Sequence, residues 1–560
     1  MNNDYASNEY DVVIIGAGLS GLQCAYSLVE NHGFEKNKIL LIEAQDYIGG
    51  RIKQTTDFVT GCKIDLGAEF IHGDNSMLND FAARTNQPLE HLFCWAHGDG
   101  GPSEAPIGDG YGLYFISGDE SKPSRLLRFD DTSVDFKSLN RNLWDLSFVD
   151  DESLDESLSM HDYLKDLGTS DDMLALAAAG FANTMACNLE ELSLKQCVHW
   201  AKEEHYDKTH SSNNSPVSSS KISFRSDKLR SGSITDKVGH SDYRFKNSYA
   251  CLVDYLKEGF KVVLNTPISL VDYTGDVDAD GVILETASGK HVHAKRVVVT
   301  CSPHVLKNSS MLRFHPALPT EKRDALDCVS MYTATKIILT FSAPFWPKGL
   351  HGMIMAGSLV PEVWFKSETP SSNFSRNSSG DTSDETLSST SSDDDSCGSE
   401  AAPVFMAVGY LSARFAEEAK AFSHEELTLK FLDQLNDVFS HFGSEHLSAK
   451  IIKSDEPLSV LTSLEKRKLP VPSSLFVKGL VYDWASAHPY IGGAYASPMA
   501  GKPTNYPEVL AKPLNNRVFF AGEATNEDAG ACTHSALETG VRAADEIAVS
   551  LSRRSVELSS

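Results

Sequence analysis

Short apolar runs followed by helical patterns mark both ends of this chain. Residues 12–15 (VVII) form a continuous run of β-branched side chains, which is typical of a parallel strand buried on both faces. Residues 39–42 (ILLI) and 518–521 (VFFA) are similar runs. Apolar positions recur at helical spacing after the first run, from Leu19 to Val29, and after the last, from Thr533. We therefore expect strand–helix units at the two ends.

The middle of the chain has a mixed pattern. Residues 262–301 alternate as strands separated by Asp-Gly and Ser-Gly turns, and residues 331–341 and 404–411 also have strand character. Residues 414–440 and 536–551 have helical periodicity. The sequence thus predicts the α/β class, with a Rossmann-like, doubly wound domain interleaved with a mixed α+β domain. We assign 8–95, 245–310 and 475–552 to the doubly wound domain, and 96–244 and 311–474 to the second.

Two polar segments interrupt the second domain. Residues 367–400 contain eight acidic residues, one Arg and almost no apolar side chains. Such a segment cannot bury enough apolar surface to offset the entropy of ordering it, so we expect a disordered insertion. The stretch at about 205–244 is also polar and is expected to be a second insertion.

Composition narrows the class of partner. The 560 residues carry a formal net charge of −27, which argues against binding to nucleic acid or anionic membranes. The charge favours a cationic substrate, although acidity also serves solubility alone. The first residues are polar, no run of 18 apolar residues occurs, and the ten cysteines lack metal-like spacing. We expect a cytoplasmic protein with reduced thiols and no metal site.

The run at 12–15 leads into a glycine-rich turn of the form GxGxxG. Gly16 permits the tight turn, Gly18 lets the backbone approach a pyrophosphate, and Gly21 lets the following helix pack on the strand. Glu43 ends the next strand, 22 residues beyond Gly21, where a carboxylate can accept the hydroxyl hydrogens of a ribose. The phosphate-binding lysine of a P-loop is absent. The motif predicts a dinucleotide, and on these residues alone both FAD and NAD fit.

The unit near the other end adds a second helix N-terminus. Gly522 and Glu523 follow the strand at 518–521, and the helix starts near Thr533. The pairing of IGAGLSGL…EA…IGGR with FFAGEAT…THSALETGVRAA resembles the FAD-dependent amine oxidase superfamily. This superfamily includes polyamine oxidases, monoamine oxidases and lysine-specific histone demethylases. The resemblance runs from about residue 10 to 550 outside the two polar segments, and it is greatest to the polyamine oxidases.

The resemblance implies an FAD site. It assigns the glycine turn to the pyrophosphate, Glu43 to the adenosine ribose, Ile268 to the adenine and Glu523 to the ribityl–phosphate arm. The residues implied to bind FAD are Gly16, Gly18, Gly21, Glu43, Gly49, Gly50, Arg51, Gly67, Ala68, Ile268, Gly522, Glu523 and Thr533. Monoamine oxidases carry their flavin on a cysteine at the position of Ala494, so we expect noncovalent FAD here.

Two polar residues are candidates for catalysis. In the strand predicted over 331–341, Lys336, Ile338 and Thr340 share one face. A lysine there is most simply an edge-strand residue, but the following PFWPKG resembles polyamine oxidases, whose strand lysine holds a water against flavin N5. His72 lies in IDLGAEFIHG (residues 64–73, including Asp65 and Gly73), a loop that runs beside the flavin in this family. A neutral histidine there can accept a hydrogen bond or a proton from the substrate ammonium.

Three aromatic residues are candidates for substrate binding. Trp484, Tyr490 and Tyr495 lie in WASAHPYIGGAYASPMAG and look like the walls that face the flavin, where cation–π attraction would orient a slender amine. Core aromatics are the plainer interpretation, above all for Trp484. The acidic substrate-binding residues vary in position within the family, so Glu190, Glu191 and Glu203 remain unassigned candidates.

These observations favour oxidation of spermine, spermidine or their acetylated forms, with hydride transfer to flavin N5 and reoxidation by O2 to give H2O2 and an aldehyde. The expected partners are a small cationic polyamine and O2, without nucleic acid or membrane. One alternative is another flavin amine oxidase or a protein-lysine oxidase or demethylase. An alternative of a different class is a flavin-holding interaction protein that uses its acidic segment as the binding element.

Overall fold

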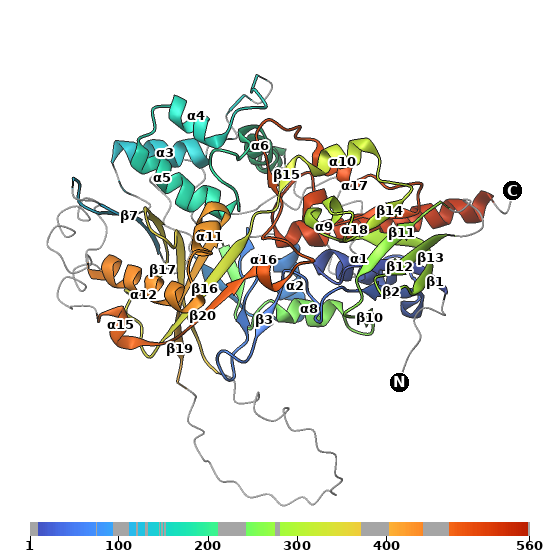
Figure 1. Cartoon of the computed structure of the whole chain (residues 1–560), viewed down its shortest axis with the longest axis horizontal. Coiled ribbons are helices and arrows are strands. Elements are labelled where there is room, and N and C mark those ends of the chain that lie inside the picture. The colour runs from blue at the N-terminus through green and yellow to red at the C-terminus, as the bar shows by residue number, and fades with distance from the viewer. Residues whose placement is uncertain are drawn as a thin grey trace, which may run out of the picture.

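The computed structural model describes residues 9–73, 76–92, 111–118, 121–128, 133–144, 153–210, 242–274, 281–370, 402–440 and 470–557, with residues 131, 146, 149 and 150 between them. Two large sheets organise the chain (Figure 1). The first sheet lies at the right of the view with both termini, and the second lies at the left.

The first sheet has the order β10-β2-β1-β13-β12-β11-β14, with β22 also paired to β13. Its strands are β1 (Glu9–Ile15), β2 (Ile39–Ile42), β10 (Lys261–Val263), β11 (Ile268–Asp272), β12 (Val282–Thr286), β13 (His291–Val299), β14 (Arg313–His315) and β22 (Val518–Phe520). β10, β2, β1, β13 and β22 run parallel. Segments far apart in the sequence therefore build one doubly wound sheet, which confirms the predicted fold class.

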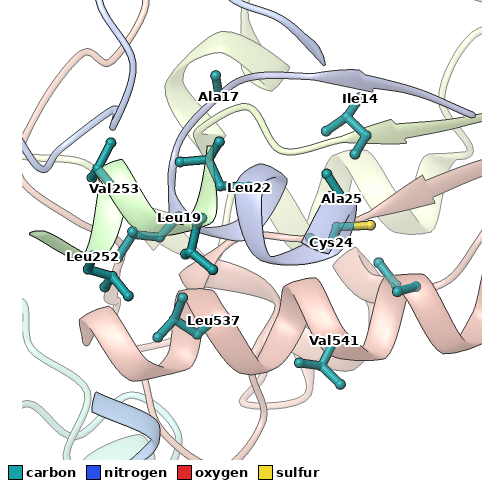
Figure 2. Packing of buried hydrophobic residues seen from close by; sticks show 14 of the residues in the cluster. Ile14, Ala17, Leu19, Leu22, Cys24, Ala25, Leu252, Val253, Leu537 and Val541 are labelled. Atoms are coloured by element: carbon teal, nitrogen blue, oxygen red, sulfur yellow. The ribbon is translucent and has the colours of Figure 1, made fainter. Parts of the chain in front are cut away.

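Two helices from opposite ends of the chain cover one face of this sheet. α1 (Leu19–Glu30) packs against α18 (Thr533–Glu557), and α8 (Ala250–Leu256) lies beside α1 (Figure 2). Leu19 points toward Leu537 in this interface, and Leu22 belongs to the same buried cluster. A Cβ at Gly540 would lie 2.5 Å from the Ser20 carbonyl oxygen, so the close approach of the helices requires glycine there. The packing brings the beginnings of both helices to one region.

The second sheet has the order β20-β16-β19-β18-β17-β7-β8. Its strands are β7 (Tyr111–Ile116), β8 (Arg125–Arg128), β16 (Ala334–Phe341), β17 (Leu350–Ala356), β18 (Glu362–Glu368), β19 (Val404–Ser412) and β20 (Phe476–Asp483). Ile337, Leu339 and Phe341 of β16 pack with α12 (His424–Ser440) on one face, as the alternation predicts. α3 (Val134–Trp144), α4 (Met160–Asp166), α5 (Asp171–Ala177), η4 (Ala178–Ala182) and α6 (Leu194–His210) lie above the sheet in Figure 1.

Smaller elements connect the two sheets. A three-stranded sheet has the order β5 (Ile71–His72), β9 (Asp242–Phe245) and β6 (Leu89–Leu92). The remaining named elements are η2 (Lys36–Lys38), β3 (Gln54–Thr55), β4 (Ile64–Asp65), α2 (Met77–Thr85), α9 (Pro303–Lys307), α10 (Thr320–Leu326), β15 (Val329–Ser330), α11 (Ala413–Ala419), α15 (Pro472–Leu475), α16 (Trp484–Ala487), β21 (Ser497–Pro498), α17 (Tyr506–Ala511) and η7 (Glu523–Thr525).

Several predicted boundaries shift. β14 belongs to the first sheet, although residues 311–474 were assigned to the second domain, and β20 belongs to the second sheet, although the segment from 475 was assigned to the first. The polar segment predicted at about 205–244 overlaps α6, which runs to His210, and β9, which begins at Asp242. Residues 211–241 and 371–401, the bulk of both predicted insertions, lie outside the described residues.

The single helical pattern at 414–440 is divided into α11 and α12. The helical pattern is interrupted because Ser423 and Glu426 cap the N-terminus of α12. The Ser423 hydroxyl accepts from the Glu426 N–H at 3.2 Å, and the Glu426 carboxylate accepts from the Ser423 N–H at 2.8 Å. This reciprocal capping starts a new helix at His424.

Candidate active site

A continuous cavity of about 700 Å³ is lined by residues of both sheets. It contacts the beginnings of α1 and α18, the loop at 65–73, strands β16 to β19, and the segment at 484–495. Of the residues assigned to cofactor, substrate or catalysis from the sequence, all but Gly21 line this cavity, and the unassigned acidic candidates are described below. The fold therefore brings together groups from opposite ends of the chain, such as Gly16 and Thr533.

The glycines of the turn at the start of α1 have two roles: Gly21 allows close packing, and Gly18 leaves the cavity accessible to a ligand. A Cβ at Gly21 would lie 2.1 Å from the Gly16 carbonyl oxygen, so this position serves the close contact of helix and strand. A Cβ at Gly18 would instead meet only the Cα of Gly50, at 3.9 Å, and Gly18 lines the cavity. The first turn of α1 contains no acidic residue and has no side-chain cap. Its N–H groups therefore suit an anion such as a pyrophosphate.

Glu43 is buried at the end of β2 and lines the same part of the cavity. Its carboxylate accepts from the N–H of Ala17 at 2.7 Å and from the N–H of Gln45 at 2.9 Å. Burial raises the pKa of Glu43, and these hydrogen bonds oppose that rise. Each carboxylate oxygen has a further lone pair, so ribose hydroxyls can still be bound there.

Arg51 and Glu523 form a second polar group that lines the cavity. Arg51 donates to the Glu523 carboxylate at 2.7 Å and to the Ala494 carbonyl at 3.0 Å. Glu523 Oε1 also accepts from the Ala496 N–H at 3.2 Å, whereas Oε2 is buried without a hydrogen-bond partner among the described residues. Gly522 has no atom within 4 Å of a Cβ built on it, so its backbone faces open space. A hydroxyl-bearing ligand would satisfy the orphaned oxygen.

These features fit FAD. Two helix N-termini, α1 and α18, open onto one cavity, with Glu43 near the first and Thr533 at the second. Ile268 and the neighbouring Thr266 and Pro267 line the end near β11. The cavity thus offers dipole ends for an anionic linker and an apolar wall for a base.

Lys336 is almost fully buried in the wall formed by β16. Its ammonium group donates to the carbonyl oxygens of Asp65 and Gly67, both at 3.0 Å, and to the Glu69 carboxylate at 2.9 Å. These three acceptors use all three N–H bonds of the side chain. In this arrangement, holding a water as the resemblance implies requires one of these bonds to be redirected.

Glu69 is the centre of a buried ion cluster, which sequence reasoning missed. Its carboxylate accepts from Lys336, from Lys366 at 2.6 Å and from Trp364 Nε1 at 3.2 Å, and Arg244 lies 3.9 Å away. Burial alone would raise the pKa of Glu69, but the three cations outweigh it and hold that pKa well below its usual range. The cluster ties the loop at 65–73 to strands β16, β18 and β9.

His72 forms a pair with Asp242. The Nδ1 atom of His72 lies 2.8 Å from an Asp242 carboxylate oxygen, and β5 and β9 pair at these two residues. A carboxylate only accepts hydrogen bonds, so the neutral imidazole carries its proton on Nδ1 and has Nε2 as the acceptor nitrogen. His72 lines the cavity. Asp242 was not a candidate because it lies in the polar stretch expected to be an insertion.

The three predicted aromatic residues have different roles in the fold. Trp484 is buried and donates through Nε1 to the Leu66 carbonyl at 3.0 Å. Tyr495 receives a hydrogen bond from the Tyr410 hydroxyl at 3.1 Å and donates to the Thr184 carbonyl. Tyr490 lines the cavity but packs against the core of the first sheet. Tyr410, on β19, is the aromatic neighbour that the sequence did not indicate.

The strand register aligns several of these groups. One row of paired residues crosses five adjacent strands. In order across the sheet, it contains Lys336, Tyr410, Glu362, Ile354 and Tyr114. Residues opposite one another in adjacent strands share a face, and all five line the cavity. The wall therefore changes from a cation, through a phenol and a carboxylate, to apolar side chains.

Glu362 is the second carboxylate of this wall and was not predicted. Its Oε2 accepts from Asn183 Nδ2 and from Thr184 Oγ1, both at 3.2 Å. Burial raises its pKa to about 7, although these hydrogen bonds and His72 lower it. The alternation EVWFKSE carried a signal, because it places Glu362, Trp364 and Lys366 on one face of a strand.

The acidic candidates from the sequence lie elsewhere. Glu191 accepts from the Tyr332 hydroxyl at 2.6 Å, Glu190 lies 3.4 Å from Arg414, and neither lines the cavity. The side chain of Glu203 lies outside the described residues. Asp65 is buried beneath the wall, where it accepts from Ser248 at 2.7 Å. Cys532 lines the cavity next to Thr533 and was not singled out.

Within the described ranges, no group of three or more His, Cys, Asp or Glu side chains could hold a metal ion. In the same part of the chain, no helix is long and apolar enough to cross a membrane.

Comparisons with known proteins identify the family of the chain. The sequence profile described as flavin containing amine oxidoreductase matches residues 19–548. The chain is 24% identical to polyamine oxidase 4 of Oryza sativa subsp. japonica over 544 residues, which cover 96% of this chain and 88% of that protein. It is 22% identical to human lysine-specific histone demethylase 2 over 554 residues, 96% of this chain but 53% of that protein.

The fold also matches solved structures. Cyclohexylamine oxidase from Brevibacterium oxydans IH-35A superposes with a TM-score of 0.66 at 17% identity, covering 98% of this chain and all of that chain. At this identity the likeness concerns the fold alone, and it agrees with the two-sheet architecture.

Proposed function

This chain belongs to the flavin-containing amine oxidoreductase family, and we propose that it oxidises polyamines, namely spermine, spermidine or their acetylated forms. The observation that carries the proposal is the wall formed by Lys336, Tyr410 and Glu362, which places a cation, a phenol and a carboxylate in the same cavity as the groups that fit FAD. The similarity to a polyamine oxidase over 96% of the chain supports it.

FAD would be held by the beginnings of α1 and α18, by Glu43 and by Glu523. When bound, the flavin would supply a hydride acceptor at N5 and pass the electrons to O2 to give H2O2, and water would hydrolyse the resulting imine to an aldehyde and a shorter amine. We propose that FAD is bound noncovalently, because Ala494 offers no sulfur on the wall that it lines.

The residues of this chain would bind, orient and deprotonate the amine. Tyr410 and Tyr495 are linked by a hydrogen bond, and burial raises the pKa of both, so they stay neutral phenols that can contact methylene groups and a cation. His72 has Nε2 as its acceptor nitrogen while Asp242 fixes the ring, so it can take a proton from the substrate ammonium. Removing that proton leaves the neutral amine from which hydride transfer proceeds.

Beyond Glu362 the cavity becomes apolar. Leu139 and Leu143 of α3, Leu176 of α5 and Phe181 of η4 line this arm. A chain of methylene groups or an uncharged acetyl end suits such a surface, whereas a second carboxylate or phosphate on the substrate does not.

The test is peroxide release by the purified, flavin-loaded protein. We expect turnover of spermine, spermidine or an acetylated form, with the cleaved bond identified by mass. Tyramine and a methyl-lysine peptide represent the other amine oxidases and the demethylases of the family. Oxidation of either one without any polyamine turnover would refute the proposal.

The mode of flavin attachment needs its own measurement. Acid precipitation should release free FAD into the supernatant. Flavin that stays with the precipitated protein would contradict noncovalent binding and direct attention to Cys532, which also lines the cavity. The cytoplasmic location expected from the sequence remains a proposal, which cell fractionation tests.

A further inference from the structure

We infer that Glu362 binds a second ammonium group of the substrate, one that is not oxidised, and thereby sets a preference for amines with two or more nitrogens. The inference rests on the proposed function and adds a specificity residue to it. Glu362 lies on β18, opposite Tyr410, and faces the cavity.

The geometry leaves one carboxylate oxygen for a ligand. Asn183 and Thr184 both donate to Oε2, and they fix the orientation of the side chain. No hydrogen bond to Oε1 comes from the described part of the chain. The side chain is only 9% exposed, so bulk water does not solvate it as it would a surface carboxylate.

Among the described residues, no cationic side chain forms an ion pair with Glu362. The groups that face it are His72 of β5, Asp242 of β9, Tyr410 of β19 and Tyr495. His72 is already paired with Asp242, and Lys336 gives its ammonium group to Glu69, Asp65 and Gly67. A buried carboxylate with neutral donors alone is costly, and a cationic ligand would supply the missing partner.

The reach matches a polyamine. Adjacent strands lie about 4.8 Å apart, so two strand spacings separate the Cα atoms of Lys336 and Glu362 by roughly 10 Å. The four-carbon spacer of spermidine separates its nitrogens by roughly 6 Å. The molecule is therefore long enough to bring a terminal ammonium to Glu362 while its secondary amine lies near Tyr410.

The experiment compares spermidine with N-butylpentylamine, in which methyl groups replace both terminal amines of spermidine. We expect Glu362→Gln to lower the ratio of kcat/KM for spermidine over N-butylpentylamine by ~10- to 100-fold, the range of a lost charge-assisted hydrogen bond. Glu362→Asp should keep part of the preference. Glu368→Gln is the matched control, because Glu368 is on the same strand but does not line the cavity.

Wild-type turnover of spermidine tests the proposed function, and the ratio tests Glu362, so the two can fail separately. An unchanged ratio in Glu362→Gln, or an equal loss in Glu368→Gln, overturns the inference. A second measurement uses the wild type alone. Because burial raises the pKa of Glu362 to about 7, the preference for spermidine should weaken as pH falls below 7. A preference that is constant from pH 6 to 8 also overturns the inference.

Discussion

Glu69 and Glu362 are two buried carboxylates that line the same cavity, 4% and 9% exposed. Glu69 is surrounded by Lys336, Lys366 and Arg244, whereas the donors to Glu362 among the described residues are the neutral side chains of Asn183 and Thr184. The cations hold the pKa of Glu69 well below its usual range, and burial raises the pKa of Glu362 to about 7.

The difference shows that burial does not decide what a carboxylate does. Glu69 has its charge compensated within the protein, so its contribution is to hold strands β16, β18 and β9 against the loop at 65–73. Glu362 has its charge uncompensated, so a ligand can complete it. The presence or absence of cationic partners within the protein therefore distinguishes a structural carboxylate from one that can bind a ligand.

The largest effect should come from Glu69. Glu69→Ala leaves three cations buried without their shared anion, and we expect it to cost about 3–5 kcal/mol of the free energy of unfolding or to prevent folding. Urea unfolding of the flavin-loaded protein measures this. Glu417→Gln removes an exposed i,i+3 pair with Lys420 and should change stability by no more than ~0.5 kcal/mol. A Glu69→Ala protein as stable as the control would show that the cluster contributes nothing.

The second effect separates the two lysines of the cluster. Both bind Glu69, but only Lys336 lines the cavity. We expect Lys336→Met to retain FAD and to slow flavin reduction or reoxidation by ~10²-fold, because a cation is lost next to the reacting groups. Lys366→Met should slow the same steps by less than ~5-fold, although it removes an equivalent ion pair. Stopped-flow absorbance of the flavin measures both rates.

Equal slowing in the two variants would contradict a special role for Lys336 and assign the effect to the disrupted cluster. Loss of flavin from Lys336→Met would instead make the residue a structural member of the strand.

Local patterns in the sequence were sufficient to predict the fold class and the residues at the part of the cavity that fits FAD. The apolar run 39–42 coincides with β2, and the helix expected from Thr533 begins there, because continuous apolar runs and helical periodicity are properties of a few neighbouring residues. The same holds for Gly18, Glu43 and Glu523, whose positions next to a strand or helix end place them at the cavity.

The charged wall could not be predicted in the same way. Lys336 meets Glu69 across 267 positions and His72 meets Asp242 across 170, so these pairs depend on which strands become neighbours. Strand order is set by long-range packing that periodicity does not contain. Glu362 was missed for this reason, because its strand was not recognised and the insertion of β19 between β16 and β18 is not local information.

A third effect tests the raised pKa of Glu362. The folded-state pKa of about 7 exceeds the ordinary value of 4.5, so the folded protein holds a proton that the unfolded chain releases. Stability should therefore fall as pH rises from about 4.5 to 7 and stay lower above that, by ~1–3 kcal/mol. Glu362→Gln removes this loss, so the variant should be more stable than wild type at pH 8 and equal to it at pH 4.5. Parallel pH dependences of the urea midpoints would contradict the shift.

The smallest effect concerns the donors that distinguish Glu362 from Glu69. Thr184→Val removes one hydrogen bond from Oε2 but no charge, and Thr184→Ser keeps it. With one donor lost, the pKa of Glu362 should rise further, so the pH below which the preference for spermidine weakens moves upward. At pH 7 we expect Thr184→Val to reduce the ratio of kcat/KM for spermidine over N-butylpentylamine by ~2- to 5-fold, the scale of one neutral hydrogen bond, and Thr184→Ser to restore it. The pH profiles of both variants measure this. A loss that Ser does not restore would assign the effect to the shape of the cavity and not to the hydroxyl, because valine and serine differ from threonine in opposite ways: valine keeps its volume, and serine keeps its donor.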